Sequence, residues 1–578
     1  MQTKKIAPIF ASLLASVLSL STANAKEPWH LSAASADSFS GDCASLGKAL
    51  ESLPNTQITL SETVAEGAQK IANKAIAEHC AIKGKMFERT SNVDGKTYAI
   101  GFEMRLPRQW NGRFLHQGNG GIDGVVQPAL GGFGGGPLSN ALDQGFAVLS
   151  SDAGHSGGTP AFGIDPQARL DYGYQAVAKL TPMAKAMLEM AYGKKPDRSY
   201  FAGCSNGGRH ALVAASRYFK DYDGILAGAP GYNLPKAAVA NLAGARLYQS
   251  VATTQAVKNH IELATAMNDA ERQLVANKVL EVCDALDGAK DGIIQNTQAC
   301  QKKFDLSRDV PSCTAQRDGS CLSVDQKRVL STIFKGPTTS KGDLIYASFP
   351  FDAGFGAGKS GVPSGGNPVG SGVAFWEFFA PLNLDSGATG LIFKAPPEDL
   401  AAFKPVEFAL NANIDALYAS MFTHNEVYSE SAMSFMTPPN ATQLKGLRDK
   451  GGKVLVYHGV SDSIFSINDS IAWLNGVQKD TGKNFAKLYP VPGMGHCSGG
   501  PSTDQFDLLT PLVKWVEQGI EPQAVVASAR GADNAGGANS DVPANWSSQR
   551  TRPLCPYPQI ATYKGKGSLE DAKSFTCR

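Results

Sequence analysis

The pentapeptide Gly203-Cys204-Ser205-Asn206-Gly207 decides the fold class of this chain. It is a G-x-S-x-G motif between an apolar stretch at 199–202, typical of a buried strand, and a run at about 208–219 that is typical of a helix. In this setting the motif predicts a sharp strand-to-helix turn that exposes the serine hydroxyl as a nucleophile. The two glycines allow neighbouring backbone to approach without a Cβ clash.

Outward from this turn, strand and helix patterns alternate in two separated blocks. The first has strands at 146–151, 199–202 and 224–227; the second has strands at 453–458 and 486–491 and helices at about 469–478 and 508–517. This βαβ rhythm predicts a mostly parallel sheet. Between the blocks the rhythm is lost, and a glycine-rich run occupies 354–372. We therefore expect an α/β-hydrolase fold with a core of 26–231 and 439–578 and an inserted lid of 232–438. An independent second domain is the alternative for the middle segment.

A serine hydroxyl needs a base within hydrogen-bond reach and an acid that fixes the tautomer of the base. In this fold the order along the chain is serine, acid, histidine. His496 lies in a glycine-rich loop after the strand at 486–491, and Asp462 follows the strand at 453–458 through a short turn. We predict Ser205, His496 and Asp462 as nucleophile, base and orienting acid. His458 is interpreted as a packed structural residue, and Asp504 and Asp507 as solvent-facing acids at a helix start.

Two cysteines flank the predicted catalytic residues. Cys204 precedes the serine and Cys497 follows the histidine. A disulfide between them would place their Cα atoms about 5.5–6 Å apart, which suits a serine and a histidine in contact. Two buried thiols are the alternative. The chain has ten cysteines but no CxxC pair, so disulfides are favoured over a zinc site.

Stabilising an oxyanion requires two backbone N–H donors. Asn206, the residue after the nucleophile, would supply one. The glycine-rich segment 117–121 follows a strand-like stretch at 113–116 and is the candidate for the second donor. A plain surface turn is the alternative interpretation of that segment.

A second cluster of acidic residues lies within 283–293. The side chains of three aspartates and two backbone carbonyls could form a calcium shell, with the ligands Asp284, Asp287, Ala289, Asp291 and Ile293. The spacing departs from that of an EF-hand loop, so a solvated acidic turn remains the alternative.

The N-terminal 25 residues indicate export. Lys4 and Lys5 precede an apolar run that ends before Ala23-Asn24-Ala25, a pattern typical of a cleaved signal peptide rather than a membrane helix. We expect a secreted or periplasmic protein. Cleavage removes two lysines and no acid, so the mature chain is formally neutral. A neutral chain argues against nucleic acid or a membrane surface as partner and favours a small, weakly charged molecule.

Taken together, these residues resemble the tannase and feruloyl esterase family. Its mark is a disulfide between a Cys-Ser pair and a His-Cys pair, with a separate aspartate; Cys204-Ser205, His496-Cys497 and Asp462 match it. The resemblance covers nearly all of the mature chain and includes the segments 162–171, 228–232 and 552–561.

The resemblance implies a serine carboxylesterase that cleaves small esters of aromatic acids beneath a lid. It also implies Ca²⁺ at the aspartate loop, Gly121 and Asn206 as oxyanion donors, and Phe465 as an aromatic that packs on the substrate ring. The further disulfide pairings that it implies are Cys43–Cys80, Cys283–Cys300, Cys313–Cys321 and Cys555–Cys577.

One departure bears on the substrate. A family member that hydrolyses a terephthalate monoester holds the free carboxylate with a lid arginine, whereas this chain has no arginine between Arg328 and Arg448. Lys394 is a weaker candidate for that role, because lysine offers a point charge rather than a fork. Candidates for the aromatic pocket walls are Trp376, Phe378 and Phe379. Ferulate or gallate esters are the alternative substrates, and a non-catalytic ligand-binding hydrolase fold is a remote one.

Overall fold

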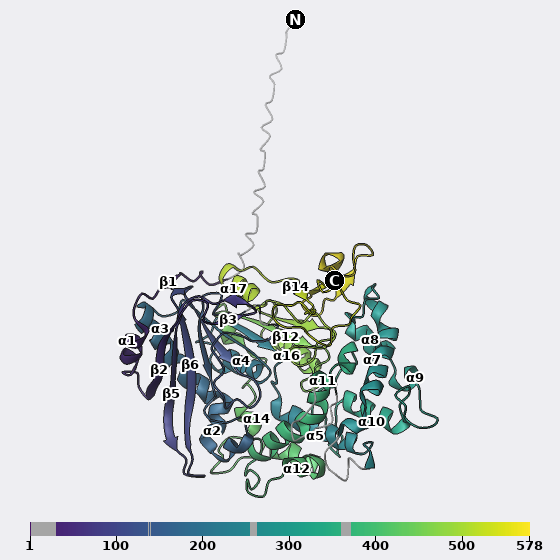
Figure 1. Ribbon diagram of the computed structural model, residues 1–578. Coiled ribbons are helices and arrows are strands. Elements are labelled where there is room, and N and C mark those ends of the chain that lie inside the picture. Colours follow the sequence, from purple (N-terminus) through teal and green to yellow (C-terminus); the bar gives the residue numbers. More distant parts are fainter. Residues whose placement is uncertain (2–29, 137, 139, 255–262, 360–371) are drawn as a thin grey trace.

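The computed structural model describes residues 1, 30–136, 138, 140–254, 263–359 and 372–578 (Figure 1). The predicted signal peptide lies outside the described residues except for Met1, as does most of the glycine-rich run of the middle segment. Among the described helices, none is long and apolar enough to cross a bilayer.

A nine-stranded mixed sheet forms the centre of the molecule. Its strands, in spatial order, are β13 (Ala486–Val491), β12 (Lys453–Gly459), β11 (Gly224–Gly228), β10 (Arg198–Cys204), β8 (Arg113–Gly118), β9 (Ala147–Ser151), β6 (Thr97–Pro107), β5 (His79–Thr90) and β2 (Thr56–Val64). The strands from β13 to β9 pair in parallel, and β6, β5 and β2 continue the sheet antiparallel. The predicted mostly parallel α/β sheet is thus confirmed, and an antiparallel extension that the βαβ pattern did not predict is added at its N-terminal edge.

Both faces of the parallel strands are buried, because successive residues of each strand enter two different apolar clusters. In β10, Tyr200 and Ala202 join one cluster and Phe201 joins the other. Helix α17 (Leu509–Gln518) packs on the first face, and helices α3 (Ala176–Tyr192), α4 (Asn206–Arg217) and α16 (Ile467–Asp480) contribute to the cluster on the second. Such double burial explains why these strands are continuous apolar runs in the sequence.

Between β11 and β12 the chain is mainly helical, and its described residues add no strand to the central sheet. Figure 1 shows these helices, coloured teal to green, gathered beside one end of the sheet. They are α5 (Leu234–Gln249), α7 (Asp269–Cys283), α8 (Thr297–Lys303), α9 (Leu306–Asp309), α10 (Val324–Lys335), α11 (Gly372–Ala374), α12 (Pro405–Asn411), α13 (Ile414–Ser420), α14 (Ala432–Phe435) and α15 (Lys445–Asp449). The sheet therefore resumes after the middle segment with the strand that carries the predicted acid.

Five disulfides link the described cysteines. They have the expected pairing, namely Cys43–Cys80, Cys204–Cys497, Cys283–Cys300, Cys313–Cys321 and Cys555–Cys577. Two short antiparallel two-stranded sheets lie near the C-terminus, β14 (Val525–Ser528) with β15 (Thr551–Leu554) and β16 (Ala561–Tyr563) with β17 (Phe575–Cys577). The disulfide Cys555–Cys577 links the residue after β15 to the last residue of β17.

Candidate active site

Ser205 occupies a strained turn between β10 and α4. Its backbone angles are φ 65° and ψ −126°, a region that residues with a side chain rarely adopt. The flanking glycines are required by close packing: a Cβ on Gly203 or Gly207 would lie 2.6 or 2.2 Å from the carbonyl oxygen of Gly118. The end of β8 therefore presses directly against the turn, and the strain lifts the hydroxyl to the edge of the sheet.

Ser205, His496 and Asp462 form one continuous hydrogen-bonded chain. His496 Nε2 lies 2.7 Å from Ser205 Oγ, and His496 Nδ1 lies 2.7 Å from Asp462 Oδ2. The other carboxylate oxygen of Asp462 accepts backbone N–H bonds of 3.0 Å from Ile464 and Phe465. The loops after β10, β12 and β13 thus bring together three residues that are far apart in the sequence.

Asp462 is buried, and its environment keeps it ionised. Burial acts to raise its pKa, but the electrostatic interaction with His496 and hydrogen bonds with His458 and His496 hold that pKa below its ordinary value. His458 Nε2 is 3.4 Å from Asp462 Oδ2 and 2.9 Å from the Phe465 carbonyl, while Nδ1 faces Ser470 Oγ. The packed structural role expected for His458 therefore includes direct support of the acid.

The disulfide Cys204–Cys497 joins the serine turn to the histidine loop, with Cα atoms 6.1 Å apart. It closes a loop with a sequence separation of 293 residues. A bridge over so long a loop restricts the unfolded chain strongly in the chain-entropy account of disulfide stability.

Replacing both Cys204 and Cys497 by alanine is expected to lower the free energy of unfolding by about 2–5 kcal/mol. It should also reduce kcat, because the two reacting side chains lose their covalent link. Denaturant unfolding and steady-state kinetics measure the two effects. The matched control removes Cys555 and Cys577, which should cost stability but leave kcat near wild type. Equal kcat values for the two double variants would contradict a catalytic contribution of the active-site bridge.

A buried carboxylate that sequence reasoning did not identify connects the acid and base loops. Asp352 Oδ2 accepts hydrogen bonds of 2.7 Å from Ser461 Oγ and from the Gly493 N–H. Ser461 precedes the acid, and Gly493 precedes the histidine by three residues. No local motif marks Asp352, because its partners are more than 100 positions away in the sequence.

The segment 118–121 lies against the serine turn. A Cβ on Gly120 would be 3.7 Å from Ser205 Cβ, and Gly120 and Gly121 are both exposed. The Gly120 carbonyl accepts the Asp123 N–H at 3.3 Å. This hydrogen bond closes a turn at 120–123. Because the Gly120–Gly121 peptide is trans, the Gly121 N–H points opposite to the Gly120 carbonyl and is not used inside the 120–123 turn. Asn206 is the first residue of α4, so its N–H has no acceptor within the helix.

A cavity of about 480 Å³ opens beside Ser205 and His496. Among the aromatic candidates, Trp376 lines it, with its ring centroid 4.6 Å from that of His496 in an edge-on arrangement. Phe378 instead packs on Tyr248, Phe379 packs on Phe375, and Lys394 pairs with Glu398.

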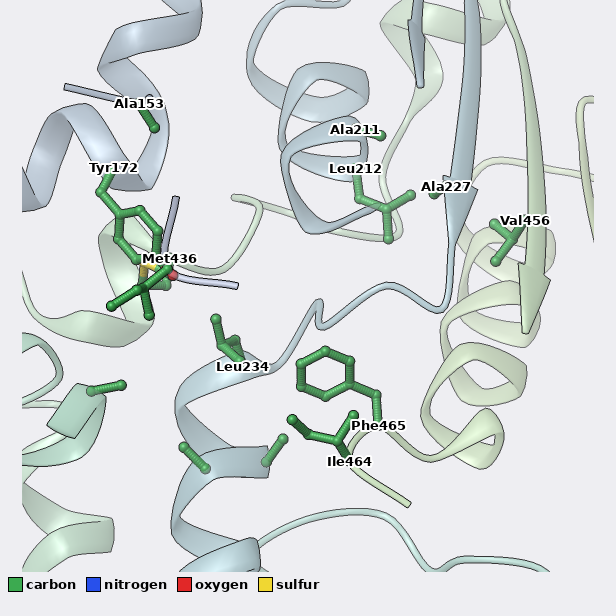
Figure 2. Packing of buried hydrophobic residues seen from close by; sticks show 14 of the residues in the cluster. Ala153, Tyr172, Ala211, Leu212, Ala227, Leu234, Met436, Val456, Ile464 and Phe465 are labelled. Atoms are coloured by element: carbon green, nitrogen blue, oxygen red, sulfur yellow. The ribbon is translucent and has the colours of Figure 1, made fainter. Parts of the chain in front are cut away.

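Phe465 lies behind the catalytic histidine. Its ring is 2% exposed, packs edge-on against His496 at 5.3 Å, and is not among the residues that line the cavity. Figure 2 shows it next to Ile464 and Leu234 in the apolar core. The substrate contact predicted for Phe465 stays a prediction.

The aspartate loop at 284–293 folds back on itself with glycines at φ 91° and 81° (Gly288 and Gly292). Asp284 accepts backbone N–H bonds from Asp291 and Gly292, and Asp291 pairs with Arg552. In the part of the chain that the structure describes, no group of three or more His, Cys, Asp or Glu side chains is arranged to hold a metal ion. One oxygen of Asp287, Oδ2, is buried and has no hydrogen-bond partner among the residues that the structure describes.

The expectation that Asp504 faces solvent is wrong. Asp504 is fully buried, pairs with Arg530 at 2.6 Å and accepts the Gly499 N–H in the loop after His496. Arg530 follows α17 in the sequence, so the burial of Asp504 depends on the tertiary fold and could not be predicted from neighbouring residues. Asp507 lies two residues before α17 and accepts N–H bonds from the first two residues of that helix, Leu509 and Thr510.

Comparison with known proteins identifies relatives of the whole chain. The sequence profile of the family described as tannase and feruloyl esterase matches residues 80–578. Mono(2-hydroxyethyl) terephthalate hydrolase of Piscinibacter sakaiensis is 36% identical over 534 residues, which cover 87% of this chain and 85% of that protein. A probable feruloyl esterase B-2 of Aspergillus fumigatus is 27% identical, over 94% of this chain and 96% of that protein. The crystal structure of feruloyl esterase B from Aspergillus oryzae superposes with a TM-score of 0.68 at 23% identity, covering 93% of this chain and 99% of that one.

The fold, the site and these relatives define a carboxylic ester hydrolase. More narrowly, the chain belongs to the tannase and feruloyl esterase family.

Proposed function

We propose that this protein is a serine esterase that hydrolyses esters of aromatic acids through an acyl-enzyme on Ser205. The observation that carries the proposal is the chain Asp462–His496–Ser205, with two contacts of 2.7 Å, at the rim of a cavity. The relatives named for terephthalate and feruloyl esters supply the substrate class. In this proposal the core is an α/β-hydrolase fold formed by 26–231 and 439–578, and the middle segment 232–438 is its lid.

In the proposed mechanism, Ser205 Oγ attacks the ester carbonyl while His496 Nε2 takes the hydroxyl proton. Asp462 stabilises the resulting imidazolium. The oxyanion binds the N–H groups of Gly121 and Asn206. His496 then protonates the leaving alcohol, and water, activated by the same histidine, releases the acid.

A catalytically inactive, ligand-binding hydrolase fold is the alternative from another class. The close contacts within the triad argue against it, because an inactive fold would have no need to keep a base 2.7 Å from the serine. Stoichiometric labelling of Ser205 by a serine-reactive phosphonate separates the two possibilities.

Two substrate classes remain, and the charge of the cavity favours one of them. A terephthalate monoester carries a free carboxylate, whereas the described residues that line the cavity include no lysine, arginine, aspartate or glutamate. Its polar lining consists of neutral groups such as Gln117, Asn119 and Gln127. Uncharged acyl groups such as ferulate or gallate therefore fit better than a terephthalate monoester.

A matched pair of substrates tests this preference. We expect the methyl ester of mono(2-hydroxyethyl) terephthalate, which lacks the free carboxylate, to be cleaved at its hydroxyethyl ester with kcat/KM about 10- to 100-fold above the monoester itself. That factor corresponds to about 1–3 kcal/mol, the cost of burying the carboxylate of the monoester without a hydrogen-bond partner. Methyl ferulate and methyl gallate should also exceed the monoester. A monoester hydrolysed as fast as its methylated form would contradict the proposal.

We also propose that the loop 284–293 binds Ca²⁺, with side chains of Asp284, Asp287 and Asp291 and carbonyls of Ala289 and Ile293 as ligands. Support comes from the Asp287 Oδ2 atom, which is buried and has no hydrogen-bond partner among the described residues, and from the two glycines that fold the loop back on itself. Bound calcium would supply positive charge that holds this loop together.

The calcium proposal predicts a change in stability. Saturating Ca²⁺ is expected to raise Tm relative to excess EGTA, with a stabilisation of about 2.7 kcal/mol at a concentration one hundred times Kd. Asp287→Asn should abolish most of this difference. Identical melting curves in Ca²⁺ and EGTA would refute the site.

Finally, we propose that residues 1–25 are a signal peptide and that the mature protein is secreted or periplasmic. The five disulfides support this proposal, since such bonds persist in oxidising compartments.

A further inference from the structure

A buried polar network lies directly beneath the serine turn, and the triad does not use it. Its centre is Asp123, which follows the glycine loop 118–121 by two positions. Asp123 Oδ2 accepts a hydrogen bond of 2.8 Å from the Asn206 side-chain amide and lies 2.9 Å from His210 Nε2. All three residues are at most 8% exposed.

The Asn206 side chain is held at both ends. Its Oδ1 accepts a 2.7 Å bond from Arg209 Nε, while its Nδ2 donates to Asp123. Arg209 is fully buried and donates to the carbonyls of Gly173, Met436 and Tyr172. The start of α4 is therefore locked between a buried guanidinium and a buried carboxylate.

Asp123 fixes the other side as well. The backbone N–H of Asp123 donates to the Gly120 carbonyl and closes the turn at 120–123, in which Asp123 has a φ of 56°. The Gly121 N–H points opposite to this carbonyl and so lies outside the 120–123 turn. Burial raises the pKa of Asp123, with Arg209 and Asn206 acting against this shift. Either protonation state leaves one carboxyl oxygen able to accept from Asn206.

We propose that Asp123 is a positioning residue that sets the separation of the two oxyanion donors, Gly121 and Asn206, by joining the loop of the first to the helix start of the second. This inference rests on the proposed esterase mechanism. Because the oxyanion develops only as the carbonyl is attacked, a displaced donor weakens transition-state binding more than ground-state binding.

The test removes the carboxylate without straining the turn. Asp123→Gly keeps the left-handed backbone accessible, and Asp123→Asn keeps an acceptor oxygen for Asn206. We expect Asp123→Gly to lower kcat by up to about 100-fold with KM changed less than about twofold, as for a donor moved by a fraction of an ångström. Asp123→Asn should stay within about threefold of wild type. Rates are expressed per site labelled by phosphonate at the end point, so unfolded molecules do not contribute.

An inhibitor pair separates positioning from general damage. An aryl trifluoromethyl ketone, which forms a tetrahedral adduct on serine, should lose affinity for Asp123→Gly in the same proportion as kcat/KM, while the product aromatic acid should bind as before. Asp385→Ala is the matched control, since Asp385 is also a buried carboxylate that accepts from an asparagine amide, that of Asn241; it should leave both affinities unchanged.

Wild-type kcat in Asp123→Gly, or equal losses of ketone and product-acid affinity, would overturn the inference. Full turnover by Ser205→Ala would instead overturn the mechanism itself, so the two failures are distinguishable.

Discussion

Replacing Ser205 by alanine is expected to reduce kcat for an aromatic ester by about 10⁶-fold, the scale of loss when the nucleophile of a serine hydrolase is removed. The residual rate would come from the oxyanion donors and from substrate binding alone. Stopped-time assays with a chromogenic aryl ester measure it. Ser199→Ala is the control, because Ser199 is a buried serine of β10, the strand that ends just before Ser205, and this variant should retain near wild-type turnover. Turnover by Ser205→Ala within tenfold of wild type would remove Ser205 from the mechanism.

Asp462→Asn is expected to lower kcat by about 10⁴-fold while the fold is retained. Oδ1 of Asp462 accepts the N–H groups of Ile464 and Phe465, so the amide oxygen of asparagine would take that place. The amide NH₂ would then face His496 Nδ1 and donate to it. This leaves the proton of His496 on Nε2, directed at Ser205 Oγ, where the ring can no longer accept the hydroxyl proton.

The steady-state kinetics of Asp462→Asn should therefore show a large fall in kcat with a small change in KM. The control is Asp469→Asn on α16, because Asp469 is a buried aspartate that bonds the Asn233 amide. A loss in Asp469→Asn as large as that in Asp462→Asn would show that the effect comes from disturbed packing rather than from the histidine tautomer.

The parallel part of the sheet was predictable because each strand is buried on both faces and so forms a continuous apolar run. The strand predicted at 224–227 is Gly224–Gly228, and that at 453–458 is Lys453–Gly459. β5 and β6 were not predicted. They are antiparallel and leave several side chains half-buried or exposed, so their apolar residues are interrupted.

The serine and histidine of the candidate site were predictable because glycines and cysteines next to them in the sequence form recognisable motifs. Gly203 and Gly207 are required by contact with Gly118, and Cys204 and Cys497 lie next to the residues that they bring together. Residues that reach the site only through the tertiary fold have no such motif beside them in the sequence. Trp376 reaches His496 across 120 positions, and Asp352 and Asp123 support the site through residues far away in the sequence.

The central claim is that Ser205 carries the acyl group during turnover. Rapid acid quenching with a slowly deacylating aryl ester, followed by proteolysis and mass spectrometry, tests it most directly. We expect the peptide that contains Ser205 to gain the mass of the acyl group, and we expect this adduct to be absent in Ser205→Ala. Steady turnover with an unmodified Ser205 peptide, or with the acyl group on another residue, would contradict the account.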